Sequence, residues 1–279
     1  MKPAMFTLNC KGRLLTIDTP VVMGIINATP DSFYEGSRKN NIDAALQQAG
    51  KMIEEGAGII DIGAQSTRPG SHIVGPEEEI SRLHAITEAI AKRFPGIFIS
   101  VDTYYSQVAM AAANMGASII NDISGGHFDP DMLTTVAGLK MPYVCMHVQG
   151  NAKTMHQLSV YNNVVTDVMD YFIQRMEQCN KAGIADIILD PGFGFSKTAE
   201  QNFQLIRSTA SFVALGKPVL IGVSRKSTIY KTLGITAQEA LNGTTVLHTA
   251  SLLAGAHILR VHDVKEAVEA IRLTRYLLP

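Results

Sequence analysis

The sequence has no tryptophan, only three cysteines and almost no net charge. Its 24 lysines and arginines are matched by 25 aspartates and glutamates, so the basic excess with which nucleic-acid-binding proteins contact phosphates is missing, and we expect no nucleic-acid partner. The few, widely spaced cysteines exclude a disulfide framework and predict reduced thiols in a cytoplasmic protein. No apolar run reaches the length of a membrane span and residues 1–13 show no secretory signal, so we expect no membrane partner.

What the sequence does contain is a repeated pattern of short apolar runs. Hydrophobic residues make up 46% of its 279 residues, which is enough for a large buried core. Eight runs rich in β-branched residues recur, at 21–26, 58–62, 97–101, 118–122, 142–146, 186–190, 218–223 and 257–261. Most are continuous rather than alternating, which is typical of strands buried on both faces of a parallel sheet.

Stretches of helical character separate these runs. Apolar residues recur on one helical face in 42–55, and after Pro76 acidic residues precede basic ones, which suits the helix dipole. Further helices are predicted at 104–115, 131–139, 161–181, 200–209, 236–254 and 263–276. Eight strand–helix repeats predict an α/β fold, a (β/α)8 TIM barrel, with residues 1–279 as a single domain. A doubly wound open sheet is the alternative, but the glycine fingerprint that often follows its first strand is missing.

Three further segments have predicted places in this barrel. Residues 5–17 contain two short runs around a turn sequence, which predicts an N-terminal β-hairpin that plugs the amino-terminal mouth of the barrel. The segments at 28–41 and 63–76 are long and rich in Gly, Pro and Ser. Because chemistry in such barrels occurs where the strands end, we expect these two segments to be mobile active-site loops.

Almost every predicted strand ends on a polar side chain, and any single one could be a helix cap or a loop hydrogen-bonding group. Taken together, Asp102, Asn121 and Asp190 offer two acceptors and one mixed donor and acceptor. That combination suits the edge of a flat, nitrogen-rich heterocycle. We expect Lys226 to pair with Asp190 and to donate to a ring oxygen.

A second set of side chains suits an anion. Arg68, Arg260 and His262 are expected to bind a phosphate or diphosphate, and Ser227 opens a helix whose start can hold a carboxylate. The phenylalanines of the predicted loops either wall a planar ligand or anchor the loops by packing, and the sequence leaves both open. These phenylalanines are Phe33, Phe193 and Phe195.

Eight motifs occur in order between residues 23 and 264: MGIINATPDSF, DIGAQSTRPG, SVDT, NDISGG, MH, DPGFGF, SRKS and RVHDV. In this order they resemble the signature of the dihydropteroate synthase family of bacterial folate biosynthesis. The resemblance implies a transferase that joins p-aminobenzoate to 6-hydroxymethyl-7,8-dihydropterin diphosphate and releases pyrophosphate. It also implies Mg²⁺ as the cofactor, inhibition by sulfonamides and a homodimer.

The resemblance further implies roles for single residues. It implies catalytic roles for Asp102, Asp190, Lys226 and Arg260. Contacts to the pterin diphosphate are implied for Thr67, Asp102, Asn121, Asp190, Lys226, Arg260, Val261 and His262. Contacts to p-aminobenzoate are implied for Phe33, Thr67, Arg68, Pro69, Phe195 and Ser227, and Mg²⁺ binding for Asn27. Cations at the diphosphate and carboxylates at the pterin favour a dissociative, SN1-like displacement.

The sequence departs from the family pattern at a few positions. Ala64 and Gln65 stand where the family usually has Gly and Glu, and Ser196 stands where DPGFGFGK has glycine. Glu35 and Ser37 alter the first long loop. None of these positions belongs to the pterin set or the anion set.

Four other interpretations compete with this one. A pterin-dependent methyltransferase shares the Asp/Asn/Asp pattern but typically lacks STRPG and SRKS. A metal-dependent hydrolase would need clustered histidines, and there is no HxH. A Schiff-base aldolase could use Lys226, yet the adjacent Arg225 favours anion binding. A non-catalytic pterin-binding module is disfavoured by Arg68, Arg260 and His262.

Overall fold

The computed structural model describes residues 5–28, 38–65, 73–155 and 158–278. Its centre is a sheet of eight parallel strands in the order β8-β7-β6-β5-β4-β3-β10-β9. The strands are β3 (Val21–Asn27), β4 (Ile59–Gly63), β5 (Phe98–Asp102), β6 (Ile119–Asp122), β7 (Tyr143–Met146), β8 (Ile187–Asp190), β9 (Leu220–Ile221) and β10 (Ile258–Val261). A parallel bridge between Leu189 of β8 and Val219, the residue directly before β9, closes the barrel, as the sequence predicts.

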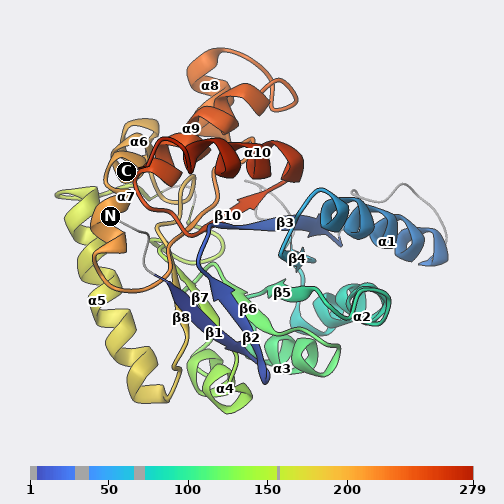
Figure 1. Cartoon of the computed structure of the whole chain (residues 1–279). Helices are drawn as coiled ribbons and strands as arrows, with labels where there is room; N and C mark the ends of the chain where they lie inside the picture. The colour runs from blue at the N-terminus through green and yellow to red at the C-terminus, as the bar shows by residue number, and fades with distance from the viewer. Residues whose placement is uncertain (1–4, 29–37, 66–72, 156–157, 279) are drawn as a thin grey trace.

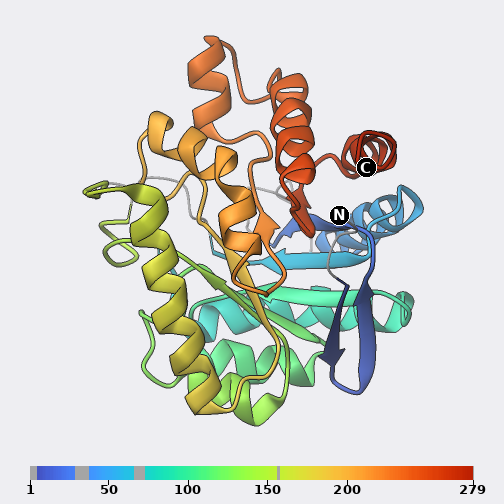
Figure 2. The same ribbon diagram turned by 60° about the vertical axis from the view of Figure 1, so that its left-hand side comes forward.

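Helices surround the barrel in both views of the ribbon (Figures 1 and 2). They are α1 (Arg38–Glu54), α2 (Pro76–Arg93), α3 (Ser106–Asn114), α4 (Met132–Leu139), α5 (Val164–Ala182), α6 (Ala199–Arg207), α7 (Thr209–Val213), α8 (Ser227–Leu233), α9 (Leu241–Leu253) and α10 (Val264–Thr274). The eight predicted strands and the strand–helix alternation are confirmed. The helix bounds differ from the predicted ones by up to five residues: α1 begins at Arg38 rather than at residue 42, and α9 begins at Leu241 rather than at residue 236. The short α7 follows α6 directly. Among the described residues, no helix combines the length and the apolarity that crossing a membrane requires.

The continuous apolar runs are explained by burial on both sides of each strand. Successive side chains of a strand point to opposite faces, so Ile59 of β4 lies in the barrel interior while Ile60 packs in the outer core under the helices. Both side chains are fully buried. Burying both faces leaves the strand ends as the places where polar side chains reach a solvent-accessible surface.

The predicted hairpin is confirmed as β1 (Phe6–Cys10) paired with β2 (Arg13–Ile17). The turn residues Lys11 and Gly12 both have positive φ, +55° and +86°, as a tight two-residue turn of this kind requires. The hairpin lies across one end of the barrel (Figure 2), where its Leu8 and Ile17 join the cluster of interior strand residues. It therefore plugs the amino-terminal mouth and leaves the opposite mouth for a ligand.

The carboxyl mouth has its own small apolar cluster. It contains Tyr104, Ile123, Met146, Val148, Met155 and Phe195. Of the two long loops predicted there, residues 29–37 and 66–72 lie outside the described residues. The predicted bounds are too wide, because residues 38–41 belong to α1, Gly63 ends β4 and Pro76 begins α2.

Candidate active site

The four residues predicted to hold a heterocycle all come from the carboxyl ends of barrel strands. Asp102 ends β5, Asn121 lies near the end of β6, Asp190 ends β8, and Lys226 follows β9. Strand pairing places Asp102 directly beside Asn121. Asn121 and Asp190 are 3% and 7% exposed, so hydrogen bonds are needed to satisfy their polar atoms. The barrel topology therefore brings this predicted set to one mouth.

Arg260 of β10 connects part of this set in a way the sequence does not show. Its Nη2 donates to Oδ2 of Asp102 at 2.7 Å, and its Nε donates to Oδ2 of Asp61 at 2.7 Å. The amide of Asn121 donates to the same Asp61 oxygen at 3.1 Å. Arg260 thus lies among the pterin set rather than apart from it. Asp61 is a strand-end acid to which sequence analysis assigns no role.

Burial and the neighbouring charges together set the protonation of this network. Burial raises the pKa of Asp102 to about 7, against the opposing effect of Arg260 and with a further rise from Asp61. Burial alone would lower the pKa of Arg260, but Asp61 and Asp102 raise it above its usual value. The guanidinium is consequently a fixed cation, and Asp102 titrates near neutral pH.

Lys226 makes a different contact from the one expected. Its Nζ donates to the carbonyl oxygen of Phe193 and lies 4.5 Å from the centre of the Phe195 ring. The predicted direct pair with Asp190 is therefore wrong, although Asp190 still acts on it through space. Burial lowers the pKa of Lys226 to about 8, while Asp190 raises it. Gly194 leaves room for this arrangement, because a Cβ there would come within 2.8 Å of the Lys226 side chain.

A second lysine, Lys197, is buried at the mouth, and the sequence assigns it no role. Its Nζ donates to the carbonyl oxygens of Gly192 and Phe195 at 3.1 and 3.0 Å and lies 3.0 Å from Nδ1 of His147. Burial lowers its pKa to about 7, against a rise caused by Asp190. The only signal in the sequence was its place directly after DPGFGFS. Lys197 ties the loop after β8 to the loop after β7.

The structure accounts for Ser196, one of the departures from the family pattern. It adopts φ +52°, a left-handed conformation that favours glycine. Its Oγ accepts from the backbone N–H of Gln149 at 2.9 Å and lies within hydrogen-bonding distance of the Met155 carbonyl, at 2.8 Å. The serine thus holds a backbone conformation that suits glycine, and its hydroxyl adds a link between the loops after β7 and β8.

The structure also accounts for Gln65, which stands where the family usually has glutamate. Its side-chain amide pairs with the backbone of Val74, donating to the carbonyl at 2.7 Å and accepting from the N–H at 3.3 Å. Its Nε2 also donates to the buried carboxyl group of Glu79 at 3.0 Å. An amide can donate to both oxygens, which an ionised glutamate at this position could not do.

The predicted anion set is only partly brought together. Arg225, which is not a member of that set, pairs its guanidinium with the carboxylate of Asp263 at 2.8 and 2.9 Å. His262 is exposed at the rim, with its Nδ1 3.1 Å from the hydroxyl of Ser224. The side chain of Val261 is buried in the outer core, so it presents only backbone to the mouth.

Ser227 is the first residue of α8, as predicted, and Phe195 is buried in the apolar cluster of the mouth. Asn27 ends β3, paired with Gly63 of β4, and is partly exposed. The remaining predicted site residues lie outside the described part of the chain. They are Phe33, Thr67, Arg68 and Pro69, together with the departures Glu35 and Ser37.

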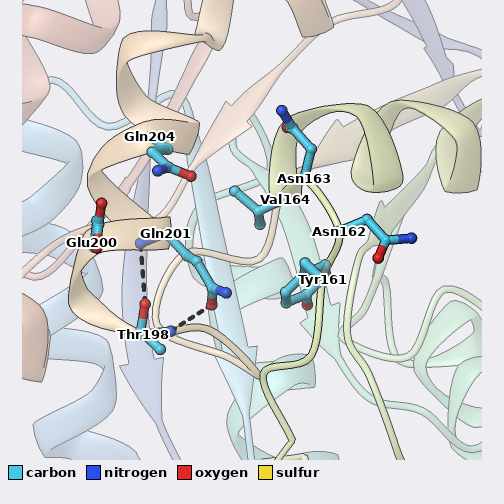
Figure 3. A pocket seen from close by; sticks show the side chains of 8 residues that line it. All are labelled: Tyr161, Asn162, Asn163, Val164, Thr198, Glu200, Gln201 and Gln204. Carbon is cyan, nitrogen blue, oxygen red and sulfur yellow. Dashed lines mark hydrogen bonds between the residues drawn. The ribbon is translucent and has the colours of Figure 1, made fainter.

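A separate cavity of about 410 Å³ lies where α5 and α6 begin (Figure 3). Its lining residues are Tyr161, Asn162, Asn163, Val164, Thr198, Glu200, Gln201 and Gln204. The two helix starts are already capped, by the side chains of Asn163 and Thr198. None of the predicted site residues lines it, so the strand ends remain the candidate site.

Comparison with known proteins agrees with this geometry. Residues 23–262 match the family described as pterin binding enzyme. The dihydropteroate synthase of Escherichia coli K12 is 44% identical over 268 residues, 95% of this chain and 94% of the relative. The chain belongs to the dihydropteroate synthase family. It is therefore a transferase of folate biosynthesis, and the methyltransferase alternative is set aside.

Solved structures of dihydropteroate synthases share the whole fold. That of Xanthomonas albilineans with 4-aminobenzoic acid has a TM-score of 0.91 and 37% identity, with 98% of both chains covered. The same enzyme in complex with 7,8-dihydropteroate has a TM-score of 0.87. The Yersinia pestis dihydropteroate synthase in a sulfonamide drug complex has a TM-score of 0.90 and 40% identity, again with 98% of both chains covered.

Proposed function

We propose that this chain joins p-aminobenzoate to 6-hydroxymethyl-7,8-dihydropterin diphosphate in one pocket at the carboxyl mouth of the barrel, with release of pyrophosphate. The strongest support is the convergence of Asp102, Asn121, Asp190 and Lys226 at that mouth. In the proposal the two carboxylates accept ring and amino N–H groups of the pterin, and the side-chain oxygen of Asn121 accepts a further one. Lys226 donates to the ring oxygen, and Met146 and Phe195 supply the apolar surroundings that a planar ring needs.

The diphosphate occupies the rim above the pterin in this proposal. The side chains of Arg260 and His262, with the backbone of Val261, supply the donors, and Thr67 joins them from the second loop. Arg260 keeps its positive charge at any working pH, since both nearby acids stabilise it. The donors then stabilise the negative charge that develops on the leaving diphosphate.

Mg²⁺ is proposed as the cofactor, with Asn27 as its protein ligand. The described residues contain no cluster of three or more His, Cys, Asp or Glu side chains that could form a cage for a metal. Magnesium is commonly bound by one or two protein oxygens together with substrate phosphates and waters, and a lone amide oxygen at the end of β3 fits that pattern. When bound, the ion would offset the charge of the diphosphate.

p-Aminobenzoate is proposed to lie against Phe195, with Ser227 near its carboxylate. Phe33, Thr67, Arg68 and Pro69 would complete this side of the pocket. Alignment of the weakly nucleophilic arylamine with the pterin methylene carbon is then the main task of these residues.

The displacement is proposed to follow a dissociative, SN1-like course. The bond between the methylene carbon and the diphosphate oxygen breaks, and its electron pair leaves with pyrophosphate. The pterin ring carries the resulting positive charge beside Asp102 and Asp190. The arylamine nitrogen then bonds to the methylene carbon and loses one proton to solvent.

Pyrophosphate release tests this function. The purified chain with Mg²⁺ is expected to release pyrophosphate only when both substrates are present. Lys226→Ala and Arg260→Ala are expected to lower turnover, the latter by roughly 2–4 kcal/mol of barrier. Lys231→Ala, an exposed lysine of α8, is the matched control and should behave like the wild type. Full activity in both site variants would contradict the assigned roles.

A homodimer in the cytoplasm is the proposed state of the enzyme. Exposed apolar side chains on α9 and α10, Val246 at 58% and Leu273 at 68%, support an interface on these helices. Light scattering is expected to give twice 30.2 kDa for the wild type and a lower mass for the double variant with Val246→Glu and Leu273→Glu. A wild-type mass of 30.2 kDa at micromolar concentration would contradict the proposal.

A further inference from the structure

Asp61 is a fully buried acid of the barrel interior that belongs neither to the predicted pterin set nor to the predicted anion set. It lies on β4 two residues before the end of the strand, and its side chain is 0% exposed. Oδ2 accepts two hydrogen bonds, from Nε of Arg260 and from Nδ2 of Asn121. Oδ1 is buried without a hydrogen-bond partner. A charge buried at such cost needs a reason beyond packing.

Strand register places Asp61 further from the mouth than the residues that end the strands. In strand register, Gly63 of β4 pairs with Asp102, whereas Asp61 pairs with Ser100, two residues further from the mouth. The hydroxyl of Ser100 is also buried without a partner. Asp61 therefore lies one layer beneath the proposed pterin pocket, and its contacts are to the residues that line that pocket.

We propose that Asp61 is a positioning residue for the pterin site, which fixes the orientation of the Asn121 amide and holds the Arg260 guanidinium between two carboxylates. With Oδ2 as acceptor, the nitrogen of Asn121 points inward to Asp61. The oxygen of that amide then faces the pocket as an acceptor for the pterin. The inference rests on the proposed pterin site.

Division of one guanidinium between two acids has an electrostatic consequence. Among the charged groups near Asp102, Arg260 and Lys226 favour its ionised form, and Asp61, Glu79 and Asp122 disfavour it. When the Asp61 charge is removed, Asp102 is the one acid that still pairs with the Arg260 guanidinium in this network. The pKa of Asp102 should then fall, so the ionised form persists to lower pH.

The variant Asp61→Asn tests the inference, with Ser100→Ala as the matched control from the same layer. Circular dichroism and thermal unfolding first establish that both are folded, and Asp61→Ser replaces Asp61→Asn if the latter is not. For each, kcat/KM for the pterin diphosphate is measured from pH 5 to 9, the KM for p-aminobenzoate is measured at neutral pH, and binding of the pterin alone is titrated by fluorescence.

Asp61→Asn is expected to lower kcat/KM for the pterin diphosphate by about tenfold or more, because the Asn121 contact to the ring and the Arg260 contact to the diphosphate are both misplaced. The acid limb of its pH profile should move to lower pH, and the KM for p-aminobenzoate should stay close to the wild-type value. Ser100→Ala should match the wild type in the pH profile of kcat/KM, in the KM for p-aminobenzoate and in pterin binding. A purely structural role for Asp61 would lower stability without moving the acid limb.

An acid limb and a pterin affinity in folded Asp61→Asn that equal those of Ser100→Ala would overturn the inference. That result is distinguishable from failure of the proposed function. If the wild type itself neither binds the pterin nor releases pyrophosphate, the pterin site is wrong, whatever the variants do.

Discussion

Glu79 is a buried acid at the start of α2, just outside the barrel. Burial raises its pKa to about 7, although hydrogen bonds from Thr103 and Gln65 and the charge of Arg82 lower it. An acid with a raised pKa favours folding in its protonated form. The stability that protonated Glu79 gives relative to the ionised form is therefore lost as the pH rises from about 4.5, where the unfolded chain ionises, to about 7. It stays lost at higher pH.

Glu79→Gln should consequently stabilise the protein more at pH 8 than at pH 5. The expected change in the stability difference between these pH values is roughly 2 kcal/mol, from the free energy that each unit of pKa shift represents. Urea unfolding at both pH values measures it. Glu78→Gln, on the exposed side of the same helix, is the control and should show little pH-dependent change. A pH-independent effect of Glu79→Gln would contradict the burial of an ionisable acid.

Ser196 offers a second test at the residue scale, because strain and hydrogen bonding oppose each other there. Ser196→Ala keeps the strained left-handed backbone and loses the hydroxyl contacts to the loop after β7, so it should cost roughly 1–3 kcal/mol. Ser196→Gly loses the same contacts but relieves the strain. Its free energy of unfolding should therefore fall less than that of Ser196→Ala, by up to about 1 kcal/mol. Thermal unfolding of both variants decides this, and a glycine variant less stable than the alanine variant would be the contrary result.

Which residues reach the mouth could be predicted from the sequence, but not what they contact there. Asp102, Asn121 and Asp190 follow from strands that end at one rim. The contact of Lys226 with Phe193 depends on a glycine-containing loop whose path is set by tertiary packing. The place of Asp61 in the network depends on strand register, which one sequence does not reveal.

At the scale of elements, the start of α5 is stabilised by one exposed side chain. The Oδ1 of Asn163 accepts hydrogen bonds from the N–H groups of Val165 and Thr166, at 3.0 and 3.3 Å. Asn163→Ala should lower the stability by about 1 kcal/mol, since it removes the cap of the helix. Asn162→Ala, which removes a neighbouring asparagine that is not the cap residue, is the matched control. Equal effects of the two substitutions in urea unfolding would argue against the cap.

Strands were easier to predict than helix boundaries. Each strand is marked by an apolar run that burial on both faces requires, whereas the start of α9 depends on a distant side chain. Thr236 and Glu239 do form the hydrogen bonds of a capping sequence. The guanidinium of Arg225 then binds the carbonyl oxygens of Ala237 and Gln238, which a helix starting at residue 236 would use for its first turn. The helix therefore begins at Leu241.

At the scale of the whole molecule, the three cysteines report on global unfolding. All three are buried, at the hairpin, in the barrel wall and in α5, and burial raises the pKa of each thiol, to about 12 for Cys10 and about 11 for Cys179. Thiolates react, and protonated buried thiols do not. A thiol reagent should therefore modify none of the three cysteines in the native protein. It should modify all three in the protein unfolded in guanidinium. Fast modification of the native protein would show that the hairpin plug or the outer core opens locally.

The fold was predictable at this scale because every strand–helix repeat carries the same signal, and the barrel is the closed arrangement that eight such repeats favour. The chemistry was predictable only where motifs and strand ends coincide. Residues 29–37 and 66–72, which carry Phe33, Thr67, Arg68 and Pro69, leave the p-aminobenzoate side of the pocket as a prediction.

A crystal structure of the enzyme with the pterin substrate bound tests the central claim most directly. The ring edge is expected within hydrogen-bonding distance of Asp102, Asn121, Asp190 and Lys226, with Asp61 beneath them and out of contact with the ligand. A pterin bound elsewhere, such as in the cavity at the start of α5 and α6, or one that leaves these four side chains untouched, would contradict it.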